Sequence, residues 1–309
     1  MPSTPFTLMP AARSAKRRKL FEKGAEGLIF ACALVSILTV VFITVFLFQR
    51  GLPLFAKTSV LEFLFSTNWE PTAADPHYGI LSFILGSVYV TGLSLLFAVP
   101  VGLSVGIYLA ELAARKSSRA IRSAVELLAG IPSVIYGLFG IALVSTVTRA
   151  LFGGTGYSLL SASIVLAIMT LPTIINVTEV SLRAVPRELK EGSLALGATH
   201  WQTIVKVLVP AARSGIIAGI VLGMGRAIGE TMAVLMVGGN APIMPSGFTG
   251  KVRTLTMNII TDMSYAKGDH LTSLFTTGIV LFVFILSLNL IVQLALKRSI
   301  SSVEGGQGA

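Results

Sequence analysis

Two charged residues lie in one of the most apolar stretches of this chain, GMGRAIGETMA at residues 223–233. A charge at the centre of a lipid-facing helix costs from about 3 to more than 10 kcal/mol, so Arg226 and Glu230 require an explanation. The guanidinium of Arg226 offers a planar fork of donors that suits an oxyanion such as phosphate. Glu230 follows one helical turn later, where it can hold the arginine and limit how tightly an anion binds. We expect Arg226, Glu230 and the adjacent Thr231 to line an anion path.

The same residues also allow a purely structural interpretation. Arg226 and Glu230 would then neutralise each other, or Arg226 would pair with Glu126 or Glu179, and the pair would only fix helix packing. Small residues at four-residue spacing precede the two charges and let another helix approach closely: Gly215, Gly219 and Gly223. Either way this helix belongs inside a bundle. The residues themselves predict an anion path without separating phosphate from sulfate or phosphonate.

The elements that must position these charges are membrane helices. The chain is 53% hydrophobic and 12% charged, with a mean hydropathy of +0.82, whereas soluble domains are about 25% charged. Apolar runs of about 20 residues, long enough to cross a bilayer, recur along the chain. We predict an all-α integral membrane protein, surrounded by lipid, with six transmembrane helices at 26–49, 80–110, 120–148, 158–181, 212–238 and 271–296.

The distribution of basic residues predicts the orientation. Of the 24 lysines and arginines, 17 lie in the two termini and in segments 111–122 and 182–213, and 6 lie in the segments on the other side. By the positive-inside rule both termini are cytoplasmic, so the net charge of +10 needs no nucleic-acid partner. We predict a basic N-terminus at 1–25, a transmembrane domain at 26–298 and a flexible C-terminal tail at 299–309.

Several chemistries find no support in the sequence. Cys32 is the single cysteine, which rules out an intrachain disulfide and a cysteine-based metal site. No HExxH motif and no nucleophile–base pair stand out, and no GxxxxGK[ST] phosphate-binding loop occurs. We expect a chain that is not an enzyme and carries no cofactor or metal. If ATP drives it, another chain binds the ATP.

Two segments outside the spans predict short amphipathic helices. In the cytoplasmic segment 182–213 a helix can begin after Pro186, Gly197 interrupts it, and a second helix runs to Pro210. On the other side, the apolar positions of 252–266 suit an amphipathic helix at the outer surface or dipping inward. The external segment 50–79 could cap the outer mouth or touch a partner.

The segment 182–213 resembles the signature loop of ATP-binding-cassette importer permeases. Glu191 and Gly197 match its glutamate and glycine at the family spacing, and Pro210 closes the motif; Gly192, Ser193, Val207 and Val209 depart from it. The resemblance implies that this segment is the coupling loop, which seats in a cleft of the ATP-binding subunit. The residues it assigns to that contact are Glu191, Gly197, His200, Trp201 and Pro210.

Three further stretches narrow the resemblance. Residues 68–111, 127–140 (LLAGIPSVIYGLFG) and 223–240 resemble the C-type permeases of the bacterial phosphate-specific transport (Pst) system. This resemblance implies a type I ABC importer permease (MetI-like) fold in the bacterial cell (inner) membrane. It implies transport of inorganic phosphate as half of a heterodimer with a second homologous permease. It also implies an extracytoplasmic phosphate-binding protein and two ATP-binding subunits that hold ATP and Mg²⁺.

Two alternatives compete with that function. One is a permease for another oxyanion, such as phosphonate, sulfate or molybdate. The other is a stand-alone ion-coupled anion transporter or channel, which would need its binding groups within one chain and often shows an internal repeat. We find no convincing repeat, and a coupling-type loop has no role in a stand-alone transporter.

Overall fold

The computed structural model describes residues 11–304, and the ends of the predicted N-terminal and C-terminal segments, 1–10 and 305–309, lie outside the described residues. The chain divides into two compact units at Arg50–Gly51. The first unit contains the helix α1 (Ala11–Gly51). Its apolar side chains between Leu28 and Phe46 are exposed, and hydroxyls such as that of Ser36 donate to the carbonyl four residues earlier. That bonding leaves few polar groups unsatisfied in lipid.

The described residues contain five or six candidate membrane spans, which agrees with the predicted six. Five helical segments are long and apolar enough to cross a membrane: Glu22–Ala56, Leu81–Leu112, Ser133–Phe152, Leu159–Arg183 and Gly268–Ile291. A sixth span results only if His200–Ala211 and Arg213–Gly229, which are bent by 70° relative to each other, are counted as one.

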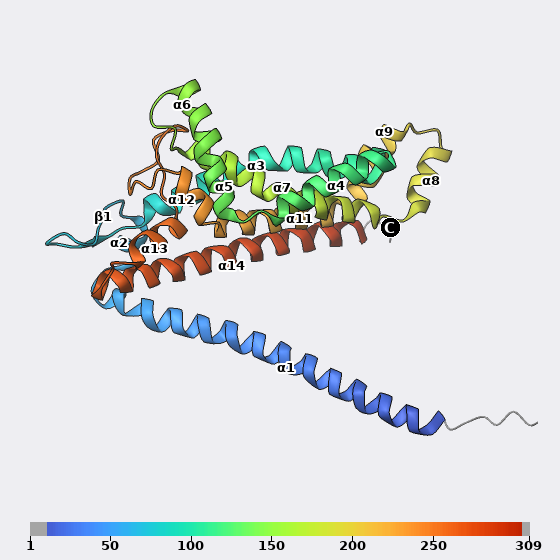
Figure 1. The fold of residues 1–309 in the computed structure, drawn as a ribbon, viewed down its shortest axis with the longest axis horizontal. Helices are drawn as coiled ribbons and strands as arrows, with labels where there is room; N and C mark the ends of the chain where they lie inside the picture. The colour runs from blue at the N-terminus through green and yellow to red at the C-terminus, as the bar shows by residue number, and fades with distance from the viewer. Residues whose placement is uncertain (1–10, 305–309) are drawn as a thin grey trace, which may run out of the picture. The chain divides into compact units, whose positions relative to one another are not determined.

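The helix α7 (Leu159–Arg183) forms the centre of the second unit. It packs against α3 (Leu81–Ile107) and α11 (Arg213–Gly229), and α11 also contacts α14 (Gly268–Glu304). Figure 1 shows these four helices running along one general direction. Small residues permit the close contacts: a Cβ added at Gly102 of α3 would lie 2.7 Å from Ile174 of α7.

The third predicted span, 120–148, is wrong in its boundaries. The structure has a separate amphipathic helix, α4 (Arg115–Gly130), followed by a break and by the spanning segment α5 (Ser133–Phe139), η3 (Gly140–Ser145) and α6 (Thr146–Phe152). Pro132 explains the break, because a proline disfavours the helical conformation of the residue before it, and Ile131 is extended, with ψ 127°.

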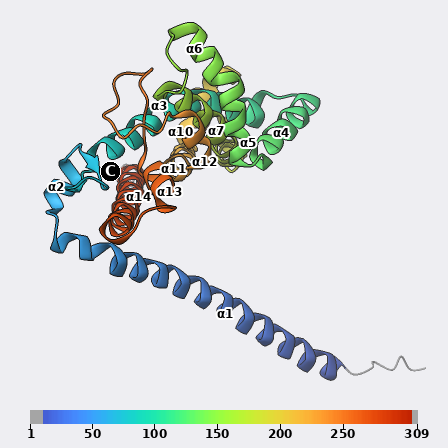
Figure 2. The same cartoon turned by 60° about the vertical axis from the view of Figure 1, so that its left-hand side comes forward.

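The fifth predicted span, 212–238, is also discontinuous. The helix α11 ends at Gly229, Glu230 is extended with φ −70° and ψ 133°, and α12 (Met232–Val237) begins after Thr231. The short α12 packs on α5 and α7, and Figure 2 shows α5, α7, α11 and α12 grouped together. A break at this depth places backbone polar groups beside the two charged residues.

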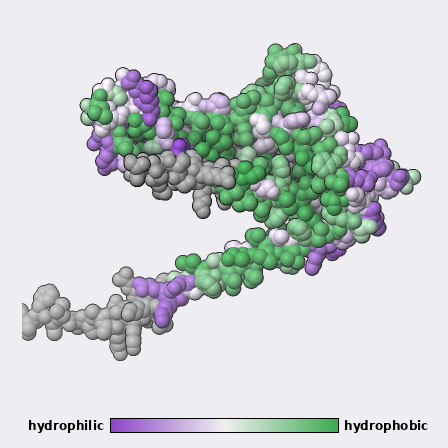
Figure 3. Space-filling view, turned by 180° about the vertical axis from the view of Figure 1, so that it is seen from behind, coloured by the Kyte–Doolittle hydropathy of each residue, from purple (hydrophilic) through white to green (hydrophobic). Residues whose placement is uncertain are grey.

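Hydrophilic segments gather at the two ends of the second unit. Figure 1 places α8 (Arg187–Ala195) and α9 (His200–Thr203) at one end, and α2 (Val60–Phe65), β1 (Trp69–Glu70) and α13 (Leu255–Met263) at the other. The β1 strand pairs antiparallel with β2 (His77–Tyr78). The turn η1 (Leu52–Ala56) precedes α2, and η2 (Tyr108–Leu112), η4 (Ile204–Leu208) and α10 (Val209–Ala211) complete the elements. Hydrophobic residues cover the face between the ends (Figure 3).

Candidate functional site

Arg226 and Glu230 flank the break in the fifth span. Arg226 lies in the last turn of α11 and its side chain is exposed in the single chain. The Glu230 carboxylate accepts the backbone N–H of Ala233, at the start of α12, at 3.2 Å, and the Thr256 hydroxyl donates to the Glu230 carbonyl at 3.1 Å. Each charge therefore lies at the helix end whose dipole favours it, the arginine at a C-terminus and the glutamate at an N-terminus.

The predicted pairing of these two residues within one helix is wrong. Since α11 ends at Gly229, the two side chains are not one turn apart on a continuous helix, and no ion pair joins Arg226 to Glu230 in the described part of the chain. The hydroxyl of Thr231 lies at the same break and donates to the Gly229 carbonyl at 3.3 Å. The three residues of the predicted path thus meet at one interruption, with Arg226 available to another group.

Neither alternative partner proposed for Arg226 pairs with it. Glu126 is exposed on α4, and Glu179 is buried on α7, where it forms ion pairs with Arg122 and with the Arg183 Nε, the latter at 2.9 Å. Arg183 also donates to the Leu109 carbonyl at 2.8 Å. Glu179 therefore joins α4, α7 and η2.

The three glycines of α11 face α7. A Cβ at Gly219 would lie 2.9 Å from Val177 Cβ, and one at Gly223 would lie 3.0 Å from Ile174 Cγ1. Gly215 lies against Ser181 in the same way. This contact holds α11 beside α7, and Arg226 follows in the last turn of the same helix.

The loop 182–213 forms the expected helix–glycine–helix bracket. Gly197 has φ +84° between α8 and α9, a conformation that favours glycine, and the Thr199 hydroxyl caps α9 by accepting the N–H of Gln202 at 3.2 Å. The assigned contact residues Glu191, His200, Trp201 and Pro210 are all exposed. Trp201 is 62% exposed and Leu196 is 91% exposed, so this bracket carries apolar surface that the described residues leave uncovered.

A cluster around Asp262 was missed from the sequence. The Asp262 carboxylate, on α13, accepts hydrogen bonds from Trp69 Nε1 at 3.0 Å and from the Tyr265 hydroxyl at 2.7 Å, and it pairs with Arg253. His270 Nε2 lies 3.3 Å from the same carboxylate. Burial raises the pKa of Asp262, but the Tyr265 hydrogen bond and the Arg253 charge outweigh burial and hold it below the ordinary value.

This Asp262 cluster ties the segment 57–80 to α13 and to the start of α14. The helix α13 confirms the short helix expected in 252–266. Two buried charged residues, Arg253 just before it and Asp262 within it, gave no periodic signal. Among the described residues, no group of three or more His, Cys, Asp or Glu could hold a metal ion.

Comparison with known proteins identifies the family. The model of the binding-protein-dependent transport system inner membrane components matches residues 98–301. The chain belongs to this family. It is a multi-pass protein of the bacterial inner membrane and a translocating subunit rather than an enzyme, and the permeases of this family carry no cofactor themselves.

Curated relatives cover most of the permease. It is 43% identical over 275 residues to the probable ABC transporter permease protein YqgH of Bacillus subtilis, a match that covers 87% of this chain and 89% of the relative. It is 36% identical over 265 residues to the phosphate transport system permease protein PstC of Xylella fastidiosa, covering 79% and 81%. The PstC protein of Haemophilus influenzae is 35% identical over 242 residues, covering 72% and 76%.

Solved structures confirm the fold. The inward-facing MetNI methionine ABC transporter superposes with a TM-score of 0.59 at 22% identity, covering 71% of the permease and 95% of that chain. A bacterial ABC transporter that imports alginate gives a TM-score of 0.61 at 16% identity, covering 91% and 99%. The permease therefore has the predicted MetI-like fold of ABC importers.

Proposed function

We propose that this permease is one of the two transmembrane subunits of an ATP-driven importer of inorganic phosphate, and that Arg226 faces the anion path. The exposed guanidinium of Arg226 within an apolar span carries this proposal. Contact with lipid would be costly for it, whereas a path between two subunits supplies water and anions. The C-type phosphate permeases among its relatives support phosphate over other oxyanions.

In this function Arg226, Glu230 and Thr231 act together at the break. Arg226 attracts the anion and offers two parallel donors. The negative charge of Glu230, held at the start of α12, limits how tightly the anion binds, so that it can leave. Thr231 offers a hydroxyl at the same place. The break itself allows the path to be lined by backbone as well as side chains.

The partners follow from the family. An ABC permease acts with an ATPase and a substrate-binding protein. Here we infer a heterodimer with a second homologous permease, two ATP-binding subunits that bind ATP and Mg²⁺, and an extracytoplasmic phosphate-binding protein. The coupling loop 182–213 contacts one ATP-binding subunit through Glu191, Gly197, His200, Trp201 and Pro210. ATP binding draws the two coupling loops together and opens the path outward, and hydrolysis resets it.

The proposed function requires the topology predicted from the sequence. Both termini and the coupling loop lie in the cytoplasm. The N-terminal segment 1–25 is basic, the transmembrane permease domain covers 26–298, and 299–309 forms a C-terminal tail. The asymmetry of lysine and arginine between the two sides supports this arrangement.

Phosphate uptake by cells that carry Arg226→Gln tests the proposal. Losing one charge-assisted hydrogen bond costs about 1.5–3 kcal/mol, so uptake should fall about 10- to 100-fold while the complex still assembles. Arg226→Lys keeps the charge but loses the planar fork, and its uptake should lie between that of the wild type and that of Arg226→Gln.

The matched control is Arg149→Gln, which removes another exposed arginine from the last turn of a helix, α6, and should leave uptake unchanged. Unchanged uptake in Arg226→Gln would refute the path, and a complex that falls apart would assign Arg226 to packing. Uptake that sulfate or phosphonate blocks better than phosphate would favour the other oxyanions. Purification without a bound ATP-binding subunit would favour a stand-alone transporter.

A further inference from the structure

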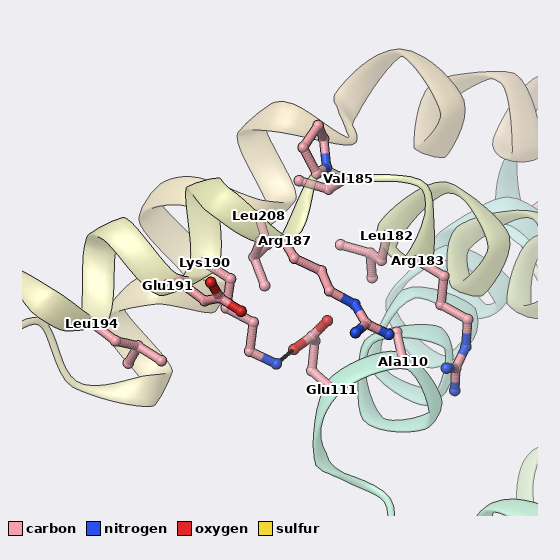
Figure 4. Close-up of a pocket in the computed structure, with 11 residues that line it drawn as sticks. Ala110, Glu111, Leu182, Arg183, Val185, Arg187, Lys190, Glu191, Leu194 and Leu208 are labelled. Atoms are coloured by element: carbon pink, nitrogen blue, oxygen red, sulfur yellow. Dashed lines mark hydrogen bonds and ion pairs between the residues drawn. The ribbon is translucent and has the colours of Figure 1, made fainter.

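A pocket separates the coupling loop from the end of the second span. It has a volume of about 400 Å³ and is lined by η2, by the end of α7 and by α8. Figure 4 shows Glu111 of η2 and Lys190 of α8 pointing toward each other across it. Arg183 and Arg187 also line the pocket. The charged groups of three elements therefore face one space.

Glu111 contacts both arms of the coupling loop. Its carboxylate Oε2 accepts a hydrogen bond from Lys190 Nζ, on α8, at 2.5 Å, and its side chain is 9% exposed. Its backbone oxygen lies 3.4 Å from His200 Nε2, on α9. The helices on either side of the Gly197 turn thus meet at one residue, and the short charge-assisted bond from Lys190 is the stronger of the two contacts.

Glu111 links the coupling loop to α3, a helix that does not adjoin the loop in the chain. The coupling loop is covalently continuous with α7 and α11, but α3 joins it only through contacts. Glu111 lies in η2, which continues α3 without a break. At its other end α3 reaches α13, where the Ser87 hydroxyl accepts the Leu255 N–H at 3.0 Å. A displacement of α8 can therefore reach the whole length of α3 through Glu111.

We propose that Glu111 is a positioning residue that transmits movement of the coupling loop to α3, through its ion pair with Lys190. The inference rests on the proposed function of the loop as the contact with the ATP-binding subunit. In this arrangement the loop moves three spans together: α7 and α11 through the chain, and α3 through Glu111. Without the pair, the ATP-binding subunit still hydrolyses ATP, but α3 loses its direct link to α8 and follows the loop only through its packing on α7.

This role is tested in the complete transporter by reversing the charge of Glu111 and then by exchanging the charges of Glu111 and Lys190. The assembly of both permeases, the ATP-binding subunits and the phosphate-binding protein is reconstituted in vesicles, and phosphate uptake and ATP hydrolysis are measured together. We expect Glu111→Lys to retain the bound ATP-binding subunit and most hydrolysis, and to lower the phosphate moved per ATP by about tenfold. Combining Glu111→Lys with Lys190→Glu restores the pair and should recover most of that ratio.

The matched control is Glu126→Lys, an equal charge reversal at an exposed position on α4, outside the coupling loop, which should keep the wild-type ratio. The proposal is overturned if Glu111→Lys keeps that ratio, if the exchanged pair recovers nothing, or if hydrolysis and uptake fall equally with loss of the ATP-binding subunit. A failure of the proposed function looks different, because the wild-type vesicles would then show no uptake dependent on the phosphate-binding protein.

Discussion

Arg226 and Glu230 are stabilised by the ends of two helices rather than by each other. The break at Glu230 places the arginine at the C-terminus of α11 and the carboxylate at the start of α12. A direct pair would satisfy both charges and leave none for a passing anion. Separate stabilisation leaves the guanidinium available to an anion in the proposed path.

A second group of charged residues has a structural role. Glu179 is buried between Arg122 and Arg183, so Glu179→Gln leaves two arginines facing each other without a carboxylate. Because both arginines are partly exposed, we expect a loss of about 1–3 kcal/mol in the free energy of unfolding. Thermal unfolding of the purified transporter measures it. Glu126→Gln, at an exposed site on α4, should change stability by less than about 0.5 kcal/mol; equal effects of the two variants would contradict the assignment.

At the scale of elements, the contact between α11 and α7 depends on the absence of side chains. Gly219→Val adds a branched side chain where even a Cβ would lie 2.9 Å from Val177, and overpacking of this kind costs about 1–3 kcal/mol. We expect a lower unfolding temperature and weaker uptake. Gly225→Ala, on the same helix, has nothing within 4 Å of the added Cβ. Gly225→Ala should be neutral or stabilising by up to about 1 kcal/mol. If it destabilises the protein, the glycines of α11 are needed for helix flexibility and not for packing.

The Asp262 cluster predicts an acid-sensitive element. The folded-state pKa of Asp262 is lowered, so its contribution to stability is complete above the ordinary value of about 3.9 and is lost as the pH falls through the lower folded value. Asp262→Asn should lower the unfolding temperature at pH 7 and flatten its decline between about pH 5 and 3. Asp75→Asn, at a side chain that is 94% exposed, should leave both unchanged. If the unfolding temperature of Asp262→Asn declines with pH as steeply as that of the wild type, other carboxylates cause the decline.

At the scale of the whole molecule, apolar surface at a hydrophilic end indicates a subunit contact. Leu196 and Trp201 are largely exposed on the coupling loop, outside the membrane in the proposed topology, where such patches mark interaction sites. We expect Leu196→Glu to reduce the ATP-binding subunit that co-purifies with the permease by about tenfold, the effect of losing about 1.4 kcal/mol.

The matched control for that experiment lies at the opposite end of the second unit. Leu61→Glu changes an exposed leucine of α2, 68% exposed, and should leave the co-purified amount at the wild-type level. Retention of the ATP-binding subunit by Leu196→Glu would contradict a contact at this point of the loop. Loss of the subunit in both variants would indicate a general assembly defect.

The sequence by itself determined the class of protein, the number of spans and the helix–glycine–helix form of the coupling loop. These features depend on local properties: apolar runs of membrane length and a glycine that tolerates positive φ. The break before α5 was also within reach, because Pro132 restricts the residue that precedes it. The orientation stays a prediction from the asymmetry of lysine and arginine.

The tertiary structure alone decided how the charges are arranged. Trp69 and Asp262 are 193 residues apart, and Arg122 and Glu179 are 57 residues apart, so no local pattern could pair them. Where α11 ends at Gly229, the hydroxyl of Thr256 on a different helix donates to the Glu230 carbonyl. A helix continues or ends according to which partners its backbone groups find, and here those partners come from elsewhere in the fold.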